Sequence, residues 1–222
     1  VAVNVALAAV ARGKRVILLD FSAHPSDLSM MLDDIPRHTI DDALARAGQV
    51  DQDLMESVLA SHPRGLRYLS SPAHEFETRA FTEGFARDVL TIAMSMADLV
   101  VVDTSEALPG AAAAAFAKSD SIVLLTMRDV ARLDATRRMI VRLGESGVDT
   151  ESIRVFVNHT ELGGEVADRE LEAILEGPIA GFIPHDPEAA FISVNSGKPL
   201  VLNQPKRPLS IVLDQIAAAD HL

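Results

Sequence analysis

The sequence predicts an α/β fold of three layers, in which a mostly parallel sheet lies between helices on both faces. Two observations lead to this prediction. Short runs of Val, Ile and Leu recur along the 222 residues, and segments with apolar residues at helical spacing lie between them. The runs are apolar at consecutive rather than alternate positions, which is typical of parallel strands covered on both faces. This alternation of strands and helices also implies right-handed crossovers.

The first half of the chain supplies two buried strands and several helices. Residues 1–12 are small and apolar on nearly every face, which predicts a buried helix that ends at Gly13. The run "VILLD" at 16–20 predicts a buried strand. Further elements are expected as helices at 39–47 and 51–61, a turn at 62–65, a short strand at 66–71, a helix at 76–96 and a strand at 99–103.

The second half continues the same alternation. Pro109 suits the first turn of an alanine-rich helix, because its missing N–H is not needed there. No internal repeat and no linker interrupts the pattern, so we predict that residues 1–222 form a single domain. Further elements are expected as a strand at 121–127, a helix at 130–144, a strand at 153–160, a helix at 165–176, a strand and loop at 179–187, and helices at 187–196 and 208–219.

Composition limits the classes of function. The chain has 20 Lys and Arg against 32 Asp and Glu, which gives a formal net charge of −12 and argues against non-specific binding to nucleic acid or to an anionic membrane. It contains no cysteine, so disulfides, thiolate metal sites and cysteine nucleophiles are excluded. Its apolar runs are too short or too interrupted to span a bilayer.

Four predicted strands end in acidic or polar residues: Asp20, Asp103, Asn158 and the segment "IPHDP" at 183–187. In open parallel sheets, ligands bind beyond the carboxyl ends of the strands, where these residues would converge. The two acids suit Mg²⁺ beside a polyphosphate. An acid after a strand is often only a helix cap, so the prediction depends on the set of four. The 222 residues contain no glycine-rich loop of the form G-x-x-x-x-G-K-[ST].

The segments "VAVNVALAAVARGKRVILLDFS", "DLVVVDTSEALPG", "IRVFVNHT" and "GFIPHDPEAAFISVNSGKPLV" carry a resemblance that covers nearly the whole chain. In order and spacing they resemble the MinD/ParA group of deviant P-loop ATPases, and within it most closely the CpaE/TadZ proteins of tight-adherence pilus assembly. The resemblance implies a three-layer P-loop NTPase-like fold. In that family a helix like residues 1–15 directly follows the phosphate loop, so we expect the first strand and that loop upstream of Val1.

The resemblance also implies roles for the strand-end acids. Asp103 matches the Walker B acid, which in the family helps to hold Mg²⁺ through water. Asp20 matches the acid that closes the second strand, at the start of the first switch region. Ser22 stands where MinD-like ATPases have a second aspartate that positions the attacking water. Because a hydroxyl cannot polarise a water as a carboxylate can, we expect weak or absent hydrolysis.

The same resemblance assigns a nucleotide-base pocket. Asn158 matches the asparagine that reads the adenine edge, and Pro184, His185 and Asp186 match the segment that packs around the adenine. The implied cofactors are ATP or ADP with Mg²⁺, and the implied assembly is a homodimer.

Three functions stay open. The first is a CpaE/TadZ-like ATP-binding protein that helps to localise or assemble a type IV, tight-adherence pilus machine in the cytoplasm, at a pole or at the inner membrane through partner proteins. The second is an active MinD/ParA-type partitioning ATPase, and the third is a non-hydrolysing scaffold of the same fold. Binding to DNA and direct membrane insertion are not expected, because the chain is acidic and its last residues, "SIVLDQIAAADHL", contain no Lys or Arg.

Overall fold

The computed structural model of the protein describes residues 1–22, 27–71, 81–104, 109–158, 166 and 168–218. Its strands are β1 (Val16–Phe21), β2 (Ala60–Ser61), β3 (Arg67–Leu69), β4 (Leu99–Thr104), β5 (Ile122–Met127), β6 (Ile153–Asn158) and β7 (Ile179–Ile183). Its helices are α1 (Ala2–Ala11), α2 (Leu28–Met31), α3 (Ile40–Leu44), α4 (Gln52–Val58), α5 (Glu83–Met96), α6 (Pro109–Lys118), α7 (Val130–Glu145), α8 (Asp168–Leu175), α9 (Pro187–Ser196), α10 (Leu200–Asn203) and α11 (Pro208–Ala218), with a 3₁₀ turn, η1, at Thr150–Ser152.

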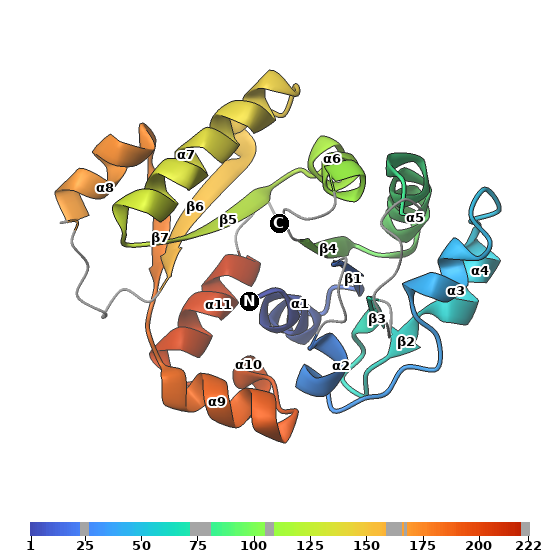
Figure 1. The fold of residues 1–222 in the computed structure, drawn as a ribbon. Coiled ribbons are helices and arrows are strands. Elements are labelled where there is room, and N and C mark those ends of the chain that lie inside the picture. The colour runs from blue at the N-terminus through green and yellow to red at the C-terminus, as the bar shows by residue number, and fades with distance from the viewer. Residues whose placement is uncertain (23–26, 72–80, 105–108, 159–165, 167, 219–222) are drawn as a thin grey trace.

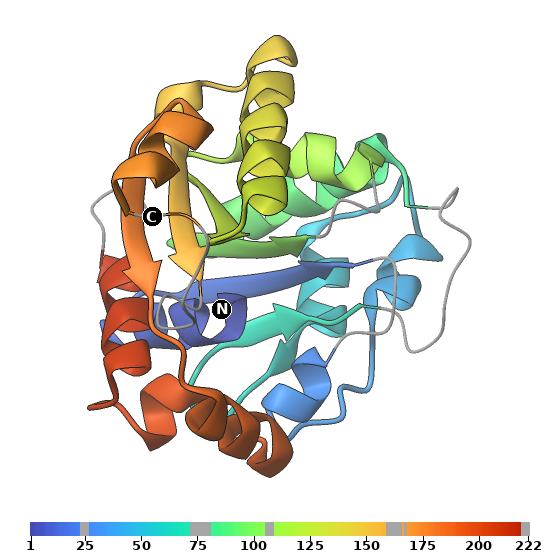
Figure 2. The ribbon, with the colours of Figure 1, turned by 60° about the vertical axis from the view of Figure 1, so that its left-hand side comes forward.

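The strands pair mostly in parallel, as predicted. One group has the order β2-β3-β1-β4 and the other the order β5-β6-β7 (Figure 2). Among the described strands, β4 pairs only with β1 and β5 only with β6, so the hydrogen bonds divide the strands into two sheets. The short strand β2 was not predicted, and it pairs antiparallel with β3.

Strand β1 explains the consecutive apolar run in the sequence, because all six of its residues are buried. Ile17, Leu19 and Phe21 belong to a core cluster that they share with α5 and α6. Val16 and Leu18 belong to a second cluster, on the opposite face, that they share with α1 and α11. Figure 1 shows these two helical layers on either side of β1 and β4.

The layer made by α1 and α11 extends over both sheets. Val123, Phe156 and Ile183, from β5, β6 and β7, pack against the same cluster as α1 and α11. The other face of these three strands packs against α7 and α8 through a smaller third cluster that includes Leu133 and Val157. The shared layer therefore joins the two sheets on one face of the molecule.

Local signals set the helix boundaries that matter for the site. Thr39 and Asp51 cap α3 and α4 with their side chains. Gly13 takes a left-handed φ of 86° and ends α1. The described part of the helix expected at 76–96 begins at Glu83, because the hydroxyl of Thr82 accepts a hydrogen bond from the amide of Phe85. None of the described helices is long and apolar enough to cross a membrane.

Candidate functional site

The structure places the two strand-end acids side by side. Asp20 and Asp103 are register partners in the parallel pair of β1 and β4. Their side chains lie on the face covered by α1, because Leu18 and Val101, two residues earlier, belong to that cluster. Asp20 is buried, with 2% of its surface exposed, whereas Asp103 is exposed. The predicted juxtaposition of these two carboxylates is therefore present.

The surroundings of Asp103 disfavour its negative charge. Desolvation by the surrounding protein raises the pKa of Asp103 above its usual range, and the charge of Asp20 raises it further. Helix α1 covers the face of the strands on which both carboxylates lie. The two acids thus meet under α1, in a place where a negative charge on Asp103 is disfavoured.

Asp20 also contacts the residue that follows β1. Its Oδ1 accepts a hydrogen bond of 3.0 Å from the backbone amide of Ser22. This contact fixes the backbone of Ser22, which is half-buried, directly after the strand. The carboxylate of Asp20 therefore has a structural role in addition to the role that the sequence suggested.

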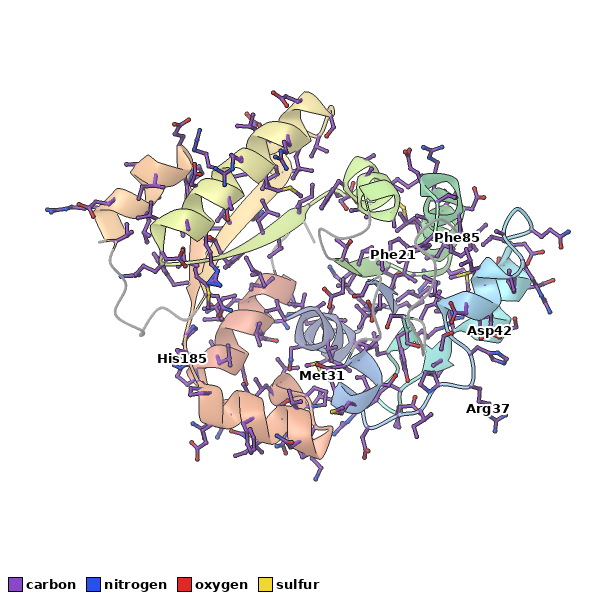
Figure 3. The ribbon with its side chains drawn as sticks, viewed as in Figure 1. Phe21, Met31, Arg37, Asp42, Phe85 and His185 are labelled. Carbon is purple, nitrogen blue, oxygen red and sulfur yellow. The ribbon has the colours of Figure 1, made fainter. Side chains whose placement is uncertain are left out.

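The second sheet brings together the residues assigned to a base pocket. Asn158 ends β6 and pairs in register with Ile183, the last residue of β7. Its side chain lies on the face covered by α1 and α11, because Phe156 belongs to that cluster. Pro184 and His185 follow directly and are half-buried, and Figure 3 shows His185 between β7 and α9. The predicted neighbours Asn158 and 184–185 thus meet at the same edge of this sheet.

Asp186 has contacts that the sequence did not suggest. Its Oδ1 accepts a hydrogen bond of 3.1 Å from the amide of Ala189 and so caps α9. Its Oδ2 lies 3.3 Å from Nη1 of Arg207. The order Asp186-Pro187 is the signal for the cap, since proline is favoured at the first position of a helix. Arg207 stands 21 residues further along, and no motif marked it.

Two further features of the described residues bear on the site. No group of three His, Asp or Glu side chains gathers there as a ready-made cage for a metal ion. A cavity of about 220 Å³ lies on the opposite face of β4 from Asp103, lined by Leu90, Val100, Val102 and Lys118 among others. It includes none of the predicted site residues, so the candidate site is the strand-end edge and not this cavity.

The chain was compared with known proteins. No family model matches it. It is 24% identical over 227 residues to an uncharacterized ATP-binding protein of Methanocaldococcus jannaschii, with 98% of this chain and 80% of the relative aligned. Its structure is similar to that of a ParA family ATPase from Chlorobium tepidum, with a TM-score of 0.89, 21% identity, and coverage of 98% of this chain and 92% of the other.

A second solved structure supports the same assignment of fold. It is the septum site-determining protein MinD from Pyrococcus horikoshii complexed with Mg-ADP, with a TM-score of 0.81, 18% identity, and coverage of 97% of this chain and 87% of the other. The fold of this chain is therefore that of the ParA/MinD P-loop ATPases, as predicted.

Proposed function

We propose that this chain is an ATP-binding protein of the MinD/ParA type, which binds ATP or ADP with Mg²⁺ at the carboxyl ends of its strands. The observation that carries the proposal is the pairing of Asp20 and Asp103 on the face covered by α1. The ATP-binding relative and the fold shared with a MinD that holds Mg-ADP support it.

The donor set fits a magnesium ion. Carboxylate oxygens are the ligands that Mg²⁺ prefers, and Asp103 would hold it, with Asp20 beside it. Desolvation and Asp20 disfavour the negative charge of Asp103, which a divalent cation would relieve. When bound, Mg²⁺ neutralises charge on the phosphate oxygens. The contribution of the chain is to hold two carboxylates in register, with Asp20 oriented by the amide of Ser22.

The base of the nucleotide would lie at Asn158 and the segment 184–186. A carboxamide offers both a donor and an acceptor, which suits the edge of adenine. Pro184 and His185 would supply the packing surface, and Asp186 would hold that segment in place through its cap on α9. We therefore expect the site to prefer ATP over GTP.

The phosphate-binding part of the proposal concerns β4 and β5. Each has one strand partner among the described residues, although both are apolar strands of the kind found inside sheets. Unpaired backbone in such a place is costly, so we propose that one further parallel strand pairs between them and carries the phosphate loop. Because Asp103 lies near the end of β4, in register with Asp20, the ligand of that loop would lie next to the acid pair.

Calorimetry with Mg-ATP and Mg-GTP tests nucleotide binding. We expect ATP to bind at least about tenfold more tightly than GTP, which is the effect of one or two well-placed hydrogen bonds. Asp103→Ala should remove the dependence of binding on Mg²⁺. Asp98→Ala is the matched control, because Asp98 lies at the other end of β4, paired with Arg15. Equal affinity for both nucleotides would refute the base assignment, and no binding of either would refute the function.

We further propose that hydrolysis is slow or absent, because position 22 offers a hydroxyl in place of a carboxylate. Ser22→Asp should raise steady-state release of phosphate by about tenfold or more. Ser61→Asp, on the exposed strand β2, adds the same charge away from the site and should change nothing. Rapid turnover by the unaltered chain, lost in Asp103→Ala, would contradict the proposal, as would an unchanged rate in Ser22→Asp.

Within this type, the finer role that we propose is CpaE/TadZ-like, in which a homodimer helps to localise or assemble a tight-adherence pilus machine. The net charge of −12 supports a protein partner over a nucleic-acid matrix. The alternative is a MinD/ParA-type positioning ATPase, which the similarity to ParA and MinD structures favours. Vigorous hydrolysis stimulated by a partner would favour this alternative, and slow hydrolysis the pilus-associated role.

A further inference from the structure

Arg207 lies at the beginning of α11 in a backbone turn that two hydrogen bonds define. Its amide donates to the carbonyl of Gln204 over 3.1 Å, and its carbonyl accepts from the amide of Ile211 over 3.0 Å. Pro208 follows at the first position of α11. The backbone of Arg207 is therefore fixed relative to α11 before its side chain makes any contact.

The guanidinium group of Arg207 reaches three side-chain oxygens. Its Nε donates to Oε1 of Gln204 over 2.9 Å, which orients the group. Its Nη1 and Nη2 each lie 3.3 Å from a carboxylate oxygen, of Asp186 and of Glu188 respectively. The side chain of Glu188 is 72% exposed and contributes little, whereas that of Asp186 is only 16% exposed. The contact with Asp186 is therefore the one that matters.

Asp186 joins two elements through its two oxygens. Oδ1 caps the first turn of α9, and Oδ2 is held by Arg207 at the start of α11. The other end of the segment is fixed by Ile183, which is 1% exposed and belongs to the cluster that contains α1 and α11. Residues 184–186 are thus held at both ends.

Helix α11 connects this segment to the acid pair. It packs against α1 through Leu213 and Ile216, and Asp214 forms an ion pair with Arg12, directly after α1. Helix α1 in turn covers the face of β1 and β4 on which Asp20 and Asp103 lie. Contacts of named residues therefore run from Asp186 through Arg207 and α11 to α1 and the acids.

We propose that Arg207 is a positioning residue for the nucleotide base. It holds residues 184–186 at a fixed place relative to α1, so that the base and the phosphates are bound at a set separation. This proposal rests on the proposed function, because it names what fixes one half of that site. We expect Arg207 to affect binding of the base and not of the phosphates, because Arg207 contacts the segment at 184–186 through Asp186.

The test compares Arg207→Met with Arg12→Met. Both variants remove one arginine from an ion pair that involves α11 or the residue directly before it, but only Arg207 contacts the base segment. In hydrogen exchange, we expect faster exchange at the amides of 188–190 in Arg207→Met, since the cap on Ala189 loses its second support. Arg12→Met should leave these amides as they are. Melting temperatures of both variants establish that they are folded.

Calorimetry in the presence of Mg²⁺ separates an effect on binding of the base from an effect on binding of the phosphates. Arg207→Met should weaken ATP binding by about threefold to tenfold, because it removes a hydrogen bond that supports the base segment and does not itself touch the base. The affinity for tripolyphosphate should stay unchanged. Arg207→Lys keeps the charge without the planar fork and should recover part of the ATP affinity.

Three results would overturn the inference. Unchanged exchange at 188–190 in Arg207→Met would mean that Arg207 does not hold the segment. An equal loss of ATP and tripolyphosphate affinity would mean that Arg207 acts on the whole fold and not on the base. If the unaltered chain binds tripolyphosphate but binds ATP and GTP with equal affinity, the role of Arg207 in binding the base is refuted. If it binds no nucleotide and no tripolyphosphate, the proposed function fails with it, and the exchange result alone still decides whether Arg207 holds the segment.

Discussion

The surroundings of Asp103 disfavour the negative charge of its carboxylate. Desolvation raises its pKa first, and the neighbouring carboxylate of Asp20 raises it further. A carboxyl group with a raised pKa in the folded state costs stability whenever it is ionised. The cost is present in full above the raised pKa and disappears as the pH falls below the ordinary value for aspartate, 3.8. Such a cost is typical of residues kept for binding and not for stability.

We therefore predict that Asp103→Asn raises the melting temperature at pH 7. Asparagine keeps the shape of the side chain and removes the unfavourable charge, so the gain should shrink as the pH is lowered and vanish below about pH 4. Each 1 kcal/mol gained would appear as about 2–4 °C in a chain of this size. Thermal unfolding followed by circular dichroism between pH 3.5 and 8 measures the effect.

Asp98, next to the other end of β4, provides a control of opposite sign. Arg15 bonds it through side chain and backbone, which lowers the pKa of Asp98 to about 2. Its contribution to stability is present above 3.8 and is lost as the pH falls toward 2. Asp98→Asn should therefore lower the melting temperature at pH 7. If both variants shift it in the same direction, the sign argument for Asp103 is wrong.

At the scale of elements, the end of α9 and the loop after α2 meet with almost no space between them. Gly197, at the end of α9, has a left-handed φ of 61°, and Asp33, after α2, has a φ of 49°. A Cβ on Gly197 would lie 2.5 Å from Cβ of Asp33. The same loop is held on its other side by Tyr68, whose hydroxyl donates to Oδ2 of Asp34 over 2.6 Å. The loop is therefore held one residue away from its close contact with Gly197.

Gly197→Ala should therefore be strongly destabilising. The added methyl group meets backbone as well as a side chain, and alanine disfavours the left-handed conformation, so we expect a loss of about 2–4 kcal/mol. Gly13→Ala is the matched control, because Gly13 has a φ of 86° but no atom lies within 4 Å of its added Cβ. That variant should lose only about 1 kcal/mol.

Urea unfolding of both variants at pH 7 separates the cost of the left-handed backbone conformation from the cost of the steric contact with Asp33. The difference between them measures the steric part alone. Equal losses would show that Asp33 yields without cost and that α2 and α9 are not held against each other.

The sequence predicted elements best where a local signal sets the boundary. The side chains of Thr39 and Asp51 stand before apolar helical patterns, and both cap helices. Helices α2 and α10 were not predicted because each has only four residues, too few for a periodic pattern. Strand β2 has two residues and exists only through its pairing with β3, which no local pattern specifies.

At the scale of the whole molecule, the two sheets differ in how well they are covered. Strand β1 lies between β3 and β4 and is buried throughout. The sheet of β5, β6 and β7 packs on α7 and α8 through a small cluster, and Leu125 of β5 is 44% exposed. The stability of the fold is therefore uneven.

We predict that native-state hydrogen exchange divides the chain into two cooperative units. Amides of β1 and α1 should be the slowest, and those of β5–β7 with α7 and α8 should open together at a lower free energy, by a few kcal/mol. Mass spectrometry of peptides at low urea concentration measures this. A single common opening free energy for both sheets would contradict the prediction.

One part of the candidate site could be predicted from the sequence, and another part could not. The pairing of Asp20 with Asp103 could be predicted, because acids at the ends of neighbouring parallel strands must meet at one edge. The cap formed by Asp186 was available from the order Asp-Pro at a helix start. The ion pair of Asp186 with Arg207 could not be predicted, because it depends on how α11 packs against the rest of the fold.

The interval between β4 and β5 has a consequence for handling the protein. Val100, Val102 and Leu125 are only partly covered there, and no described strand pairs with the second edge of either β4 or β5. Apolar strand edges of this kind serve as templates on which copies of a chain associate. The charge of −12 makes the copies repel one another, but salt screens that repulsion over about 10 Å at 0.1 M. A sample in which the proposed further strand does not fill this interval should therefore lose monodispersity sooner at high than at low ionic strength.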